Sequence, residues 1–510
     1  MTKAYNPALV AKSLLRGEVL PAEFYFEHLD WLSQSAYGLS AALINESGDA
    51  SIATKSSQDC FDSHAQAIDP ETIFNIASIT KPITVATILK MIEIDKFAEY
   101  FHDGLETKLS NLYSFLESRY PELDYIKSGR LRVEDPRISI KDLITHTSGI
   151  VSFDGKTFGQ KLRFESAESL SKAADGKFLE PVRASGEWGK YEYSDVGYEL
   201  LGMLISAIAS DASKKAGGDI VTCGQAMRDL VIKPLGMTRT FTSDQLKLGG
   251  EERVEVDGFP DQKIARGYDC NYDGKITESL VFHRCIATSG TYSTPLDLCR
   301  FVRAVFSNKT STEGGFFEKT ETIKLQQSHE VLQVEVKRNE DGIVVERVEK
   351  KDDKGSDNYG VGFMFWVNPD GGNKLQYHGA RTAGYSGWIG YRNGKAACCL
   401  VSCQNLTTYF ARAKLESEIC EGRIENTDDA RHSRLYEINQ ELLEKYTKEE
   451  LLGALRKAEF HPDKVREEND TNLLRELTSL EKAKKPRSFV EAAQAGKYGK
   501  MTSPGGAHEL

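Results

Sequence analysis

Hydrophobic and polar positions alternate in blocks that predict both strands and helices. Residues 41–53 read as two strands around a polar Ser47-Gly48-Asp49 turn. Residues 83–92 are apolar at nearly every position, which predicts a buried helix that accommodates Pro82 in its first turn. Residues 360–367 and 396–402 read as two further strands late in the chain. We therefore expect an antiparallel sheet built from early and late segments.

The middle of the chain has helical patterns, at residues 198–208 and 225–232, and Pro234 and Gly236 end the second helix. The fold class expected is α/β (α+β), an antiparallel sheet flanked by helices with a mostly helical insertion at about residues 99–260. Residues 99–136 and 318–355 are polar and charged, and we expect surface excursions that either cover a site or only decorate the fold.

Two domains are expected. Residues 1–425 would form one large unit, and residues 426–510 a charged helical extension with a flexible tail.

Composition narrows the class of protein. The 510 residues are 40% hydrophobic and 28% charged, with no apolar stretch of membrane-spanning length, so we expect a soluble protein. A formal net charge of −11 argues against a nucleic-acid binder. Nine cysteines and an N-terminus without a secretory apolar core predict a cytoplasmic location. The final His508-Glu509-Leu510 only resembles a retention signal, which has no meaning without secretion.

The candidate chemistry begins at Ser78 and Lys81, which precede the apolar helix. At a spacing of three residues the hydroxyl and the amine share one helix face. A serine needs a base to become nucleophilic, and a lysine whose charge is disfavoured by burial can supply one. The same spacing recurs at Ser169 to Lys172 and Ser479 to Lys482, but in polar surroundings where we expect solvated surface.

Three further motifs follow in order, Thr145-His146-Thr147-Ser148-Gly149, Tyr193-Ser194-Asp195 and His378-Gly379-Ala380. Together with Ser78-x-x-Lys81, they make residues 39–405 resemble the β-lactamase-related serine hydrolases. That family includes class C β-lactamases, D-alanyl-D-alanine carboxypeptidases, family VIII esterases and lovastatin-type fungal acyltransferases. The resemblance implies a β-lactamase/transpeptidase-like fold.

The resemblance also implies catalytic roles. Ser78 would be the acylated nucleophile, Lys81 would help to remove its proton, and Tyr193 would pass a proton to the leaving group. The backbone N–H groups of Ser78 and Arg381 would form the oxyanion hole.

Two positions differ from the family pattern. Asp195 stands where asparagine is usual, so it would either hold Lys81 protonated, leaving Tyr193 as a phenolate base, or bind an amine of the substrate. Ala380 stands where glycine is usual and adds a methyl group beside the site.

Other residues have two readings. His146 is expected to make a structural turn rather than to act as a base. His378 either lines the site or supports its strand. Trp188 and Tyr385 either line an acyl or leaving-group pocket or serve packing, and Gly379 is expected to line the site. Cys398, Cys399 and Cys403 are expected to be buried hydrophobic residues, so neither a metal nor a cofactor is predicted.

The expected function is acyl transfer through an acyl-enzyme on Ser78, by hydrolysis or transesterification of a small-molecule ester. An amide, peptide or β-lactam hydrolase is the alternative, although His378 replaces the lysine that would engage a β-lactam carboxylate. A non-catalytic scaffold of the same fold is the alternative of another class. The sequence does not separate hydrolase from transferase, because the two share every residue named.

Overall fold

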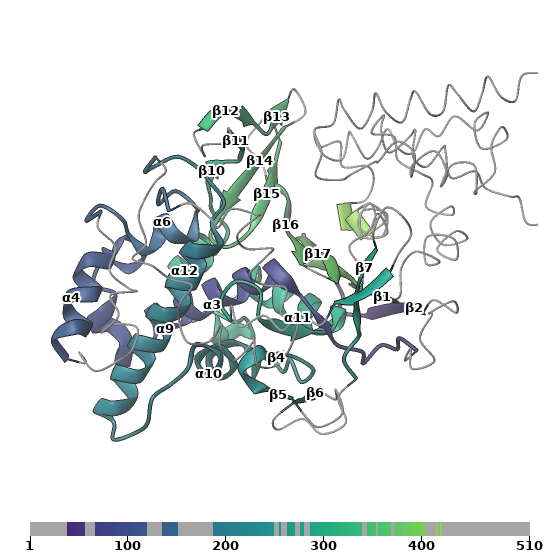
Figure 1. Cartoon of the computed structure of the whole chain (residues 1–510), viewed down its shortest axis with the longest axis horizontal. Helices are drawn as coiled ribbons and strands as arrows, with labels where there is room; N and C mark the ends of the chain where they lie inside the picture. The colour runs from purple at the N-terminus through teal and green to yellow at the C-terminus, as the bar shows by residue number, and fades with distance from the viewer. Residues whose placement is uncertain are drawn as a thin grey trace, which may run out of the picture. The chain divides into compact units, whose positions relative to one another are not determined.

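The structure is a computed structural model, shown in Figure 1. It describes residues 38–56, 67–119, 135–150, 187–248, 254–256, 263–270, 276–279, 286–338, 344–352, 355–368, 373–382, 384–402, 415–416 and 419–420. All of them belong to one compact unit, Leu20–Ser433. The expected extension at 426–510 and the other two Ser-x-x-Lys copies lie outside the described residues.

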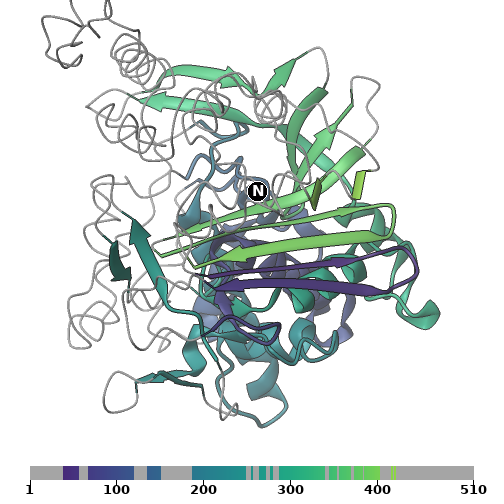
Figure 2. The same cartoon turned by 90° about the vertical axis from the view of Figure 1, so that its right-hand side faces the viewer.

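A nine-stranded antiparallel sheet organises this unit. Its order is β10-β14-β15-β16-β17-β18-β1-β2, with β13 paired to β14. The strands are β1 (Gly38–Ile44), β2 (Ala50–Ser56), β10 (His329–Leu332), β13 (Lys351–Asp352), β14 (Gly355–Gly360), β15 (Met364–Val367), β16 (Asn373–Thr382), β17 (Tyr385–Arg392) and β18 (Lys395–Val401). Early strand β1 pairs with late strand β18, with Leu39 opposite Val401, and Figure 2 shows them side by side. The sheet predicted from early and late segments is confirmed.

The sheet is buried on both faces at β18, which explains why this strand is apolar after Lys395. Successive side chains of a strand point to opposite faces. Cys398 and Leu400 therefore join the main core, whereas Cys399 joins a second cluster with Trp366 and Trp388. The prediction that cysteines here are buried hydrophobic residues is confirmed for Cys398 and Cys399, both free thiols; position 403 is not among the described residues.

Helices cover one face of the sheet. They are α3 (Thr80–Glu93), α4 (Leu109–Arg119), α6 (Ile140–Ile144), α9 (Asp195–Lys215), α10 (Cys223–Met227), α11 (Pro295–Val305) and α12 (Thr320–Gln326), with short helical turns η1 (Ala77–Ile79), η2 (Asp95–Tyr100), η3 (Gly104–Glu106), η4 (Arg228–Ile232), η5 (Ser243–Gln245) and η7 (Ser311–Glu313). Helix α11 packs on β1, β17 and β18. In Figure 1, α4, α6 and α9 lie together on the side away from β1 and β2.

Four small sheets complete the described part. Strands β3 (Phe74–Asn75), β9 (Thr291–Ser293) and β4 (Phe241–Thr242) form one, and β5 (Leu246–Leu248) pairs with β6 (Val254–Val256). Strand β7 (Gly267–Cys270) pairs with β8 (Ile276–Ser279), and β11 (Val334–Arg338) with β12 (Val344–Glu349).

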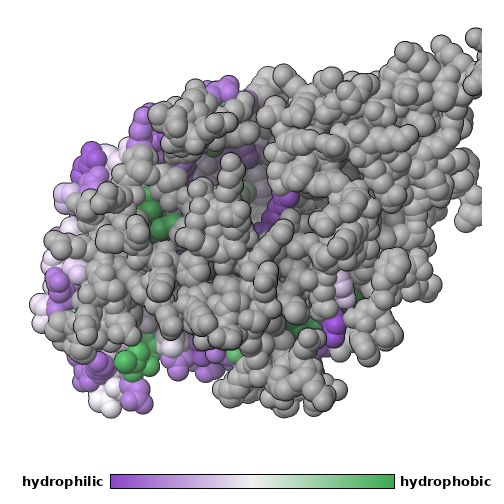
Figure 3. Space-filling model, viewed as in Figure 1, coloured by the Kyte–Doolittle hydropathy of each residue, from purple (hydrophilic) through white to green (hydrophobic). Residues whose placement is uncertain are grey.

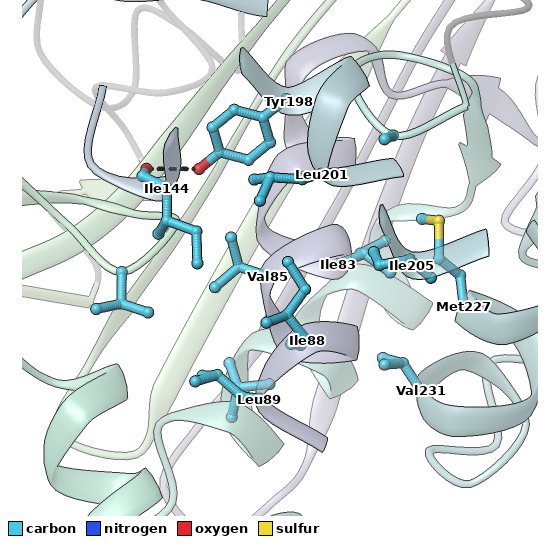
Figure 4. Packing of buried hydrophobic residues seen from close by; sticks show 14 of the residues in the cluster. Ile83, Val85, Ile88, Leu89, Ile144, Tyr198, Leu201, Ile205, Met227 and Val231 are labelled. Carbon is cyan, nitrogen blue, oxygen red and sulfur yellow. Dashed lines mark hydrogen bonds between the residues drawn. The ribbon is translucent and has the colours of Figure 1, made fainter. Parts of the chain in front are cut away.

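Helix α3 is buried almost all round, as its apolar sequence predicts. Its Ile83, Val85, Ile88 and Leu89 are at most 2% exposed. Figure 4 shows them packed among residues of α9, α10 and η4, such as Leu201, Ile205, Met227 and Val231. Burying four such side chains contributes roughly 1.5–3 kcal/mol each. The start of α3 is thereby held firmly.

Some predicted boundaries and roles were wrong. Residues 360–367 are not one strand, because the left-handed backbone of Gly362 (φ 82°) makes a turn between β14 and β15. Residues 99–136 are not only a surface excursion, since Leu109, Leu112 and Leu116 of α4 enter the main core. The 318–355 excursion instead contributes β10 and β13 to the edge of the sheet.

Hydrophilic residues predominate along one edge of the described surface. On the face seen in Figure 3, the coloured atoms along the edge formed by α4 and α9 are mainly hydrophilic. The large hydrophobic residues that stay exposed are scattered singly, at Ile52, Trp188, Ile220 and Val348. Within the described residues, no helix combines the length and apolar character that crossing a membrane requires.

Gly362 offers a test of this packing. A Cβ atom there would lie 2.9 Å from the Val85 side chain on α3, in addition to the strain of a positive φ. Gly362→Ala should lower the free energy of unfolding by about 2–4 kcal/mol, the sum of left-handed strain and overpacking. Gly217→Ala is the matched control, because Gly217 has φ 78° but nothing within 4 Å of its Cβ position. Denaturant unfolding should show the larger loss at Gly362; equal losses would mean that contact with α3 does not matter.

Candidate active site

A strained turn presents Ser78. The chain leaves β3 and enters η1 through Ala77, whose φ of 43° is unusual for a residue with a side chain. Asn75 holds this turn: its Oδ1 accepts from the Ala77 N–H at 2.8 Å, and its Nδ2 donates to the Ser289 carbonyl at 3.2 Å. Ser78 is left half-exposed directly before α3. The sequence predicts that Ser78 opens the helix; Ser78 lies instead in the turn η1 that leads into α3, which begins at Thr80.

Lys81 is fully buried, and polar groups surround its Nζ. Its Nζ donates to Ser78 Oγ at 2.9 Å, to Asp195 Oδ1 at 2.6 Å and to the Thr288 carbonyl at 3.5 Å. This is the arrangement of an ammonium group. The predicted approach of Ser78 and Lys81 on one helix face is confirmed.

The charge of Lys81 differs from the expectation. Burial alone would lower the pKa of Lys81, but the Asp195 carboxylate and the Tyr193 hydroxyl outweigh burial and raise it. A raised pKa keeps the lysine protonated at every pH below its ordinary value, so the pair stabilises the fold throughout the neutral range. The expectation that burial makes Lys81 a neutral base is wrong for the free protein. Asp195 instead pairs with it, which is one of the two roles left open for this residue.

Tyr193 lies directly beside the lysine. Lys81 Nζ is 4.8 Å from the centre of the Tyr193 ring. Burial raises the pKa of Tyr193, and although the charge of Lys81 and hydrogen bonds with Lys81 and Ser78 lower it, the balance remains above its ordinary value. Tyr193 is therefore a neutral phenol that can donate a proton. The expectation of a resting phenolate is wrong, because burial outweighs the lysine.

His146 packs against the Tyr193 ring and is hydrogen-bonded to the neighbouring backbone. It follows α6 with a left-handed φ of 60°, which confirms the predicted structural turn. Its ring centre lies 4.3 Å from that of Tyr193, and its Nδ1 accepts from the Ser194 N–H at 3.0 Å. Burial, together with the charge of Lys81, lowers the pKa of His146 well below its ordinary value. The imidazole is thus neutral and fixes the Tyr193 segment.

His378 is buried within the sheet. Its Nε2 lies 3.2 Å from the hydroxyl of Tyr359, and its Nδ1 lies 2.7 Å from the Gly379 carbonyl. Burial lowers the pKa of His378 to about 3, with the charge of Lys81 acting in the same direction. These contacts match the alternative in which His378 supports the strand rather than lining an exposed site, and the ring carries no charge at neutral pH.

Strand β16 packs against η1 and so lies next to Ser78. The Ala380 side chain is buried in the main core opposite Gly387, so its methyl group is accommodated inside the protein. Gly379 is half-exposed and Arg381 is exposed at the end of the strand. The oxyanion hole of Ser78 and Arg381 N–H groups stays a prediction.

Two other predicted lining residues have structural contacts. The Tyr385 hydroxyl donates to the Ala265 carbonyl at 2.7 Å, and the ring is buried. Trp188 is 42% exposed, donates to Asp142 Oδ2 at 3.3 Å and stacks with Arg137. Packing accounts for Tyr385, whereas the lining role of Trp188 stays a prediction.

Glu199 and Thr288 are functional candidates that the sequence reasoning missed. Glu199 lies one turn after Asp195 on α9, and its carboxylate is hydrogen-bonded to the Thr288 hydroxyl. The spacing of four residues from Asp195 is a signal that could have indicated Glu199. Thr288 has no such signal, because only the tertiary structure brings its segment to α3 and α9.

An antiparallel sheet, a Ser-x-x-Lys helix beside it and a tyrosine over the lysine are the features that mark the β-lactamase-related class of proteins. The chain belongs to the Beta-lactamase family, whose sequence model matches residues 47–414.

Protein Rv1367c and uncharacterized protein MT1414, both from Mycobacterium tuberculosis, are similar in sequence. Each is 27% identical over 247 residues, which are 47% of this chain and 55% of the relative. The chain thus spans about half the length of the curated relatives it matches.

Two solved structures share the fold. The octameric penicillin-binding protein homologue from Pyrococcus abyssi aligns with a TM-score of 0.54 and 19% identity, over 78% of this chain and 77% of its own. The penicillin binding protein from Bacillus halodurans aligns with a TM-score of 0.51 and 18% identity, over 77% of this chain and 98% of its own. At these identities, the likeness is one of fold.

Asp195→Asn tests the charge state of Lys81. Without the carboxylate, burial dominates, and the pKa of Lys81 should fall. The rate at which an activated ester acylates Ser78 should then gain a rising limb at the pH where the lysine loses its proton, whereas in the wild-type protein the lysine contributes no such limb near neutral pH. Asp219→Asn, at an exposed position beyond α9, is the matched control. Identical pH profiles for Asp195→Asn and wild type would show that the ion pair does not govern the lysine.

Proposed function

We propose that the protein transfers acyl groups through an acyl-enzyme on Ser78, acting on a small-molecule ester by hydrolysis or transesterification. The observation that carries the proposal is the position of Lys81 Nζ, 2.9 Å from Ser78 Oγ and 2.6 Å from Asp195 Oδ1. The nucleophile Ser78, the proton carrier Lys81 and the carboxylate of Asp195 are thus joined in one line of hydrogen bonds, the catalytic line. An activated nucleophile requires such a connection to a base.

The proton path follows from this line. As Ser78 Oγ attacks the acyl carbon, its proton passes to Lys81 Nζ while a lysine proton passes to Asp195 Oδ1. Tyr193, a neutral phenol, gives its proton to the leaving oxygen as the bond to the acyl carbon breaks. The phenolate then recovers a proton from Lys81, which takes one back from Asp195. The net result moves the serine proton to the leaving group and restores all three residues.

The substrate class is supported by the charge of the strand beside Ser78. His378 is buried and neutral, so it supplies no cation for a substrate carboxylate. His378 therefore does not perform the role of the lysine that would engage a β-lactam carboxylate, which favours an ester over a β-lactam; Arg381 is the cation at the exposed end of this strand. An ester is also the easier substrate, since its leaving alkoxide needs less assistance than an amine.

Labelling of the nucleophile tests the proposal. A fluorophosphonate or an activated ester should leave one covalent adduct on Ser78, found by mass spectrometry of the digested protein. Ser78→Ala should lose the adduct, whereas Ser118→Ala, an exposed serine on α4, should keep it. A protein that neither labels nor turns over any activated ester would be a non-catalytic scaffold.

Tyr193→Phe tests the proton donor. It should lower kcat for an ester with a poor leaving group by about two to four powers of ten, the usual contribution of general acid catalysis. An ester with a good leaving group, such as p-nitrophenol, needs little protonation and should lose much less. Equal losses on both substrates would contradict the donor role.

A survey of products separates hydrolase from transferase. Activated esters and thioesters of short and medium acyl chains should be offered with and without alcohols or amines. Faster turnover with an acceptor, and transfer of the acyl group to it, would identify a transferase; rates that ignore every acceptor would identify a hydrolase.

A further inference from the structure

A second carboxyl group lies behind the lysine. Asp195 and Glu199 are one turn apart at the start of α9, and Thr288 links both of them to Lys81. The Thr288 hydroxyl is hydrogen-bonded to Glu199 Oε1 and lies 3.3 Å from the Asp195 carbonyl. The Thr288 carbonyl accepts from Lys81 Nζ at 3.5 Å. Glu199 is thus coupled to the catalytic line without touching Ser78.

The Thr288 hydroxyl has a single proton, so its hydrogen bonds depend on Glu199. When Glu199 is ionised, the hydroxyl donates to it. When Glu199 is protonated, the carboxyl can donate to the hydroxyl, which then turns to the Asp195 carbonyl. Burial raises the pKa of Glu199 to about 7, while the Thr288 hydrogen bond acts to lower it. Both forms are therefore populated near neutral pH.

We propose that Glu199 is a positioning residue whose ionisation increases the ability of the Lys81–Asp195 pair to accept the proton of Ser78. The proposal rests on the proposed function of Ser78. Before acylation, Lys81 and Asp195 together carry no net charge; once they hold the serine proton, they carry one positive charge. A negative Glu199 stabilises the charged state and a neutral Glu199 does not. Acylation should therefore be faster on the alkaline side of the Glu199 titration.

The groups around Glu199 agree with this sign. Asp195 on its own helix raises the pKa of Glu199, and Lys81 from α3 lowers it. From α10 it faces Cys223, whose thiol is kept protonated by burial and by Glu199 itself. Thr288 faces it from the segment before β9. The lysine is thus the one cation among the groups that act on Glu199 in the described part of the chain.

The test is the pH dependence of Ser78 acylation in single turnovers with a p-nitrophenyl ester. The wild-type rate should rise through about pH 7 by roughly tenfold, the change expected for one pKa unit of coupling. Glu199→Gln should remove this limb and hold the rate near the acidic level of wild type. Glu321→Gln, on the exposed face of α12, is the matched control and should keep the limb.

Thr288 variants separate this role from a structural one. Thr288→Val preserves the shape and the backbone carbonyl but removes the hydrogen bond, so the limb should move up by about one pH unit. Thr288→Ser should restore its position. A limb that stays in place in Glu199→Gln, or that Thr288→Val does not move, would overturn the proposal.

An infrared titration provides a readout that does not need activity. The wild-type protein should show a protonated-carboxyl band that disappears through about pH 7 and is absent from Glu199→Gln. If the band titrates but the acylation rate does not rise through about pH 7, the positioning role of Glu199 fails, and the proposal of an acyl-enzyme on Ser78 is unaffected. If Ser78 is never acylated, the proposed function fails, and a missing band would then overturn the inference about Glu199 as well.

Discussion

The ion pair between Lys81, which is fully buried, and Asp195, which is partly exposed, is the interaction on which the site depends. An ammonium group inside a protein is costly unless a counter-charge and further acceptors surround it. Asp195 Oδ1 supplies the charge at 2.6 Å, and Ser78 Oγ and the Thr288 carbonyl complete the shell. Because Lys81 lies in the first turn of α3 and Asp195 opens α9, satisfying this one charge also sets the two helices against each other and brings Tyr193 over the lysine.

The surroundings of this pair are kept neutral by the same burial. The charge of Lys81 adds to burial in lowering the pKa of His146 and His378, and burial raises the pKa of Tyr193 and Tyr359. These rings pack on one another, with the Tyr359 hydroxyl beside His378 and the His146 ring against Tyr193. A neutral aromatic layer therefore packs beside the ion pair, and charges acting on the fully buried Lys81 are screened less than they would be in water.

The scaffold holds the strained turn at Ser78. A left-handed Ala77 persists only where surrounding structure over-determines it. Here Asn75 bonds the turn to the Ser289 carbonyl, β3 pairs with β9, and α3 is buried on nearly every side. Strand β16 packs on η1 and completes the frame. Ser78 is thus positioned by elements that pack on one another.

Local sequence patterns were enough to predict the buried helix, the contact between Ser78 and Lys81, and the family. The apolar run at 83–92 specified the buried helix, and the spacing of Ser78 and Lys81 specified their contact, because helical geometry relates residues three apart. The order of the motifs identified the family. The charge state of the site was decided only by the tertiary structure, since Lys81 and Asp195 are 114 residues apart and their pairing reverses the effect of burial. The contact between Thr288 and Glu199 was likewise decided by the tertiary structure. The charge state of a titratable group depends on neighbours that the fold brings together, and the sequence pattern does not contain those distances.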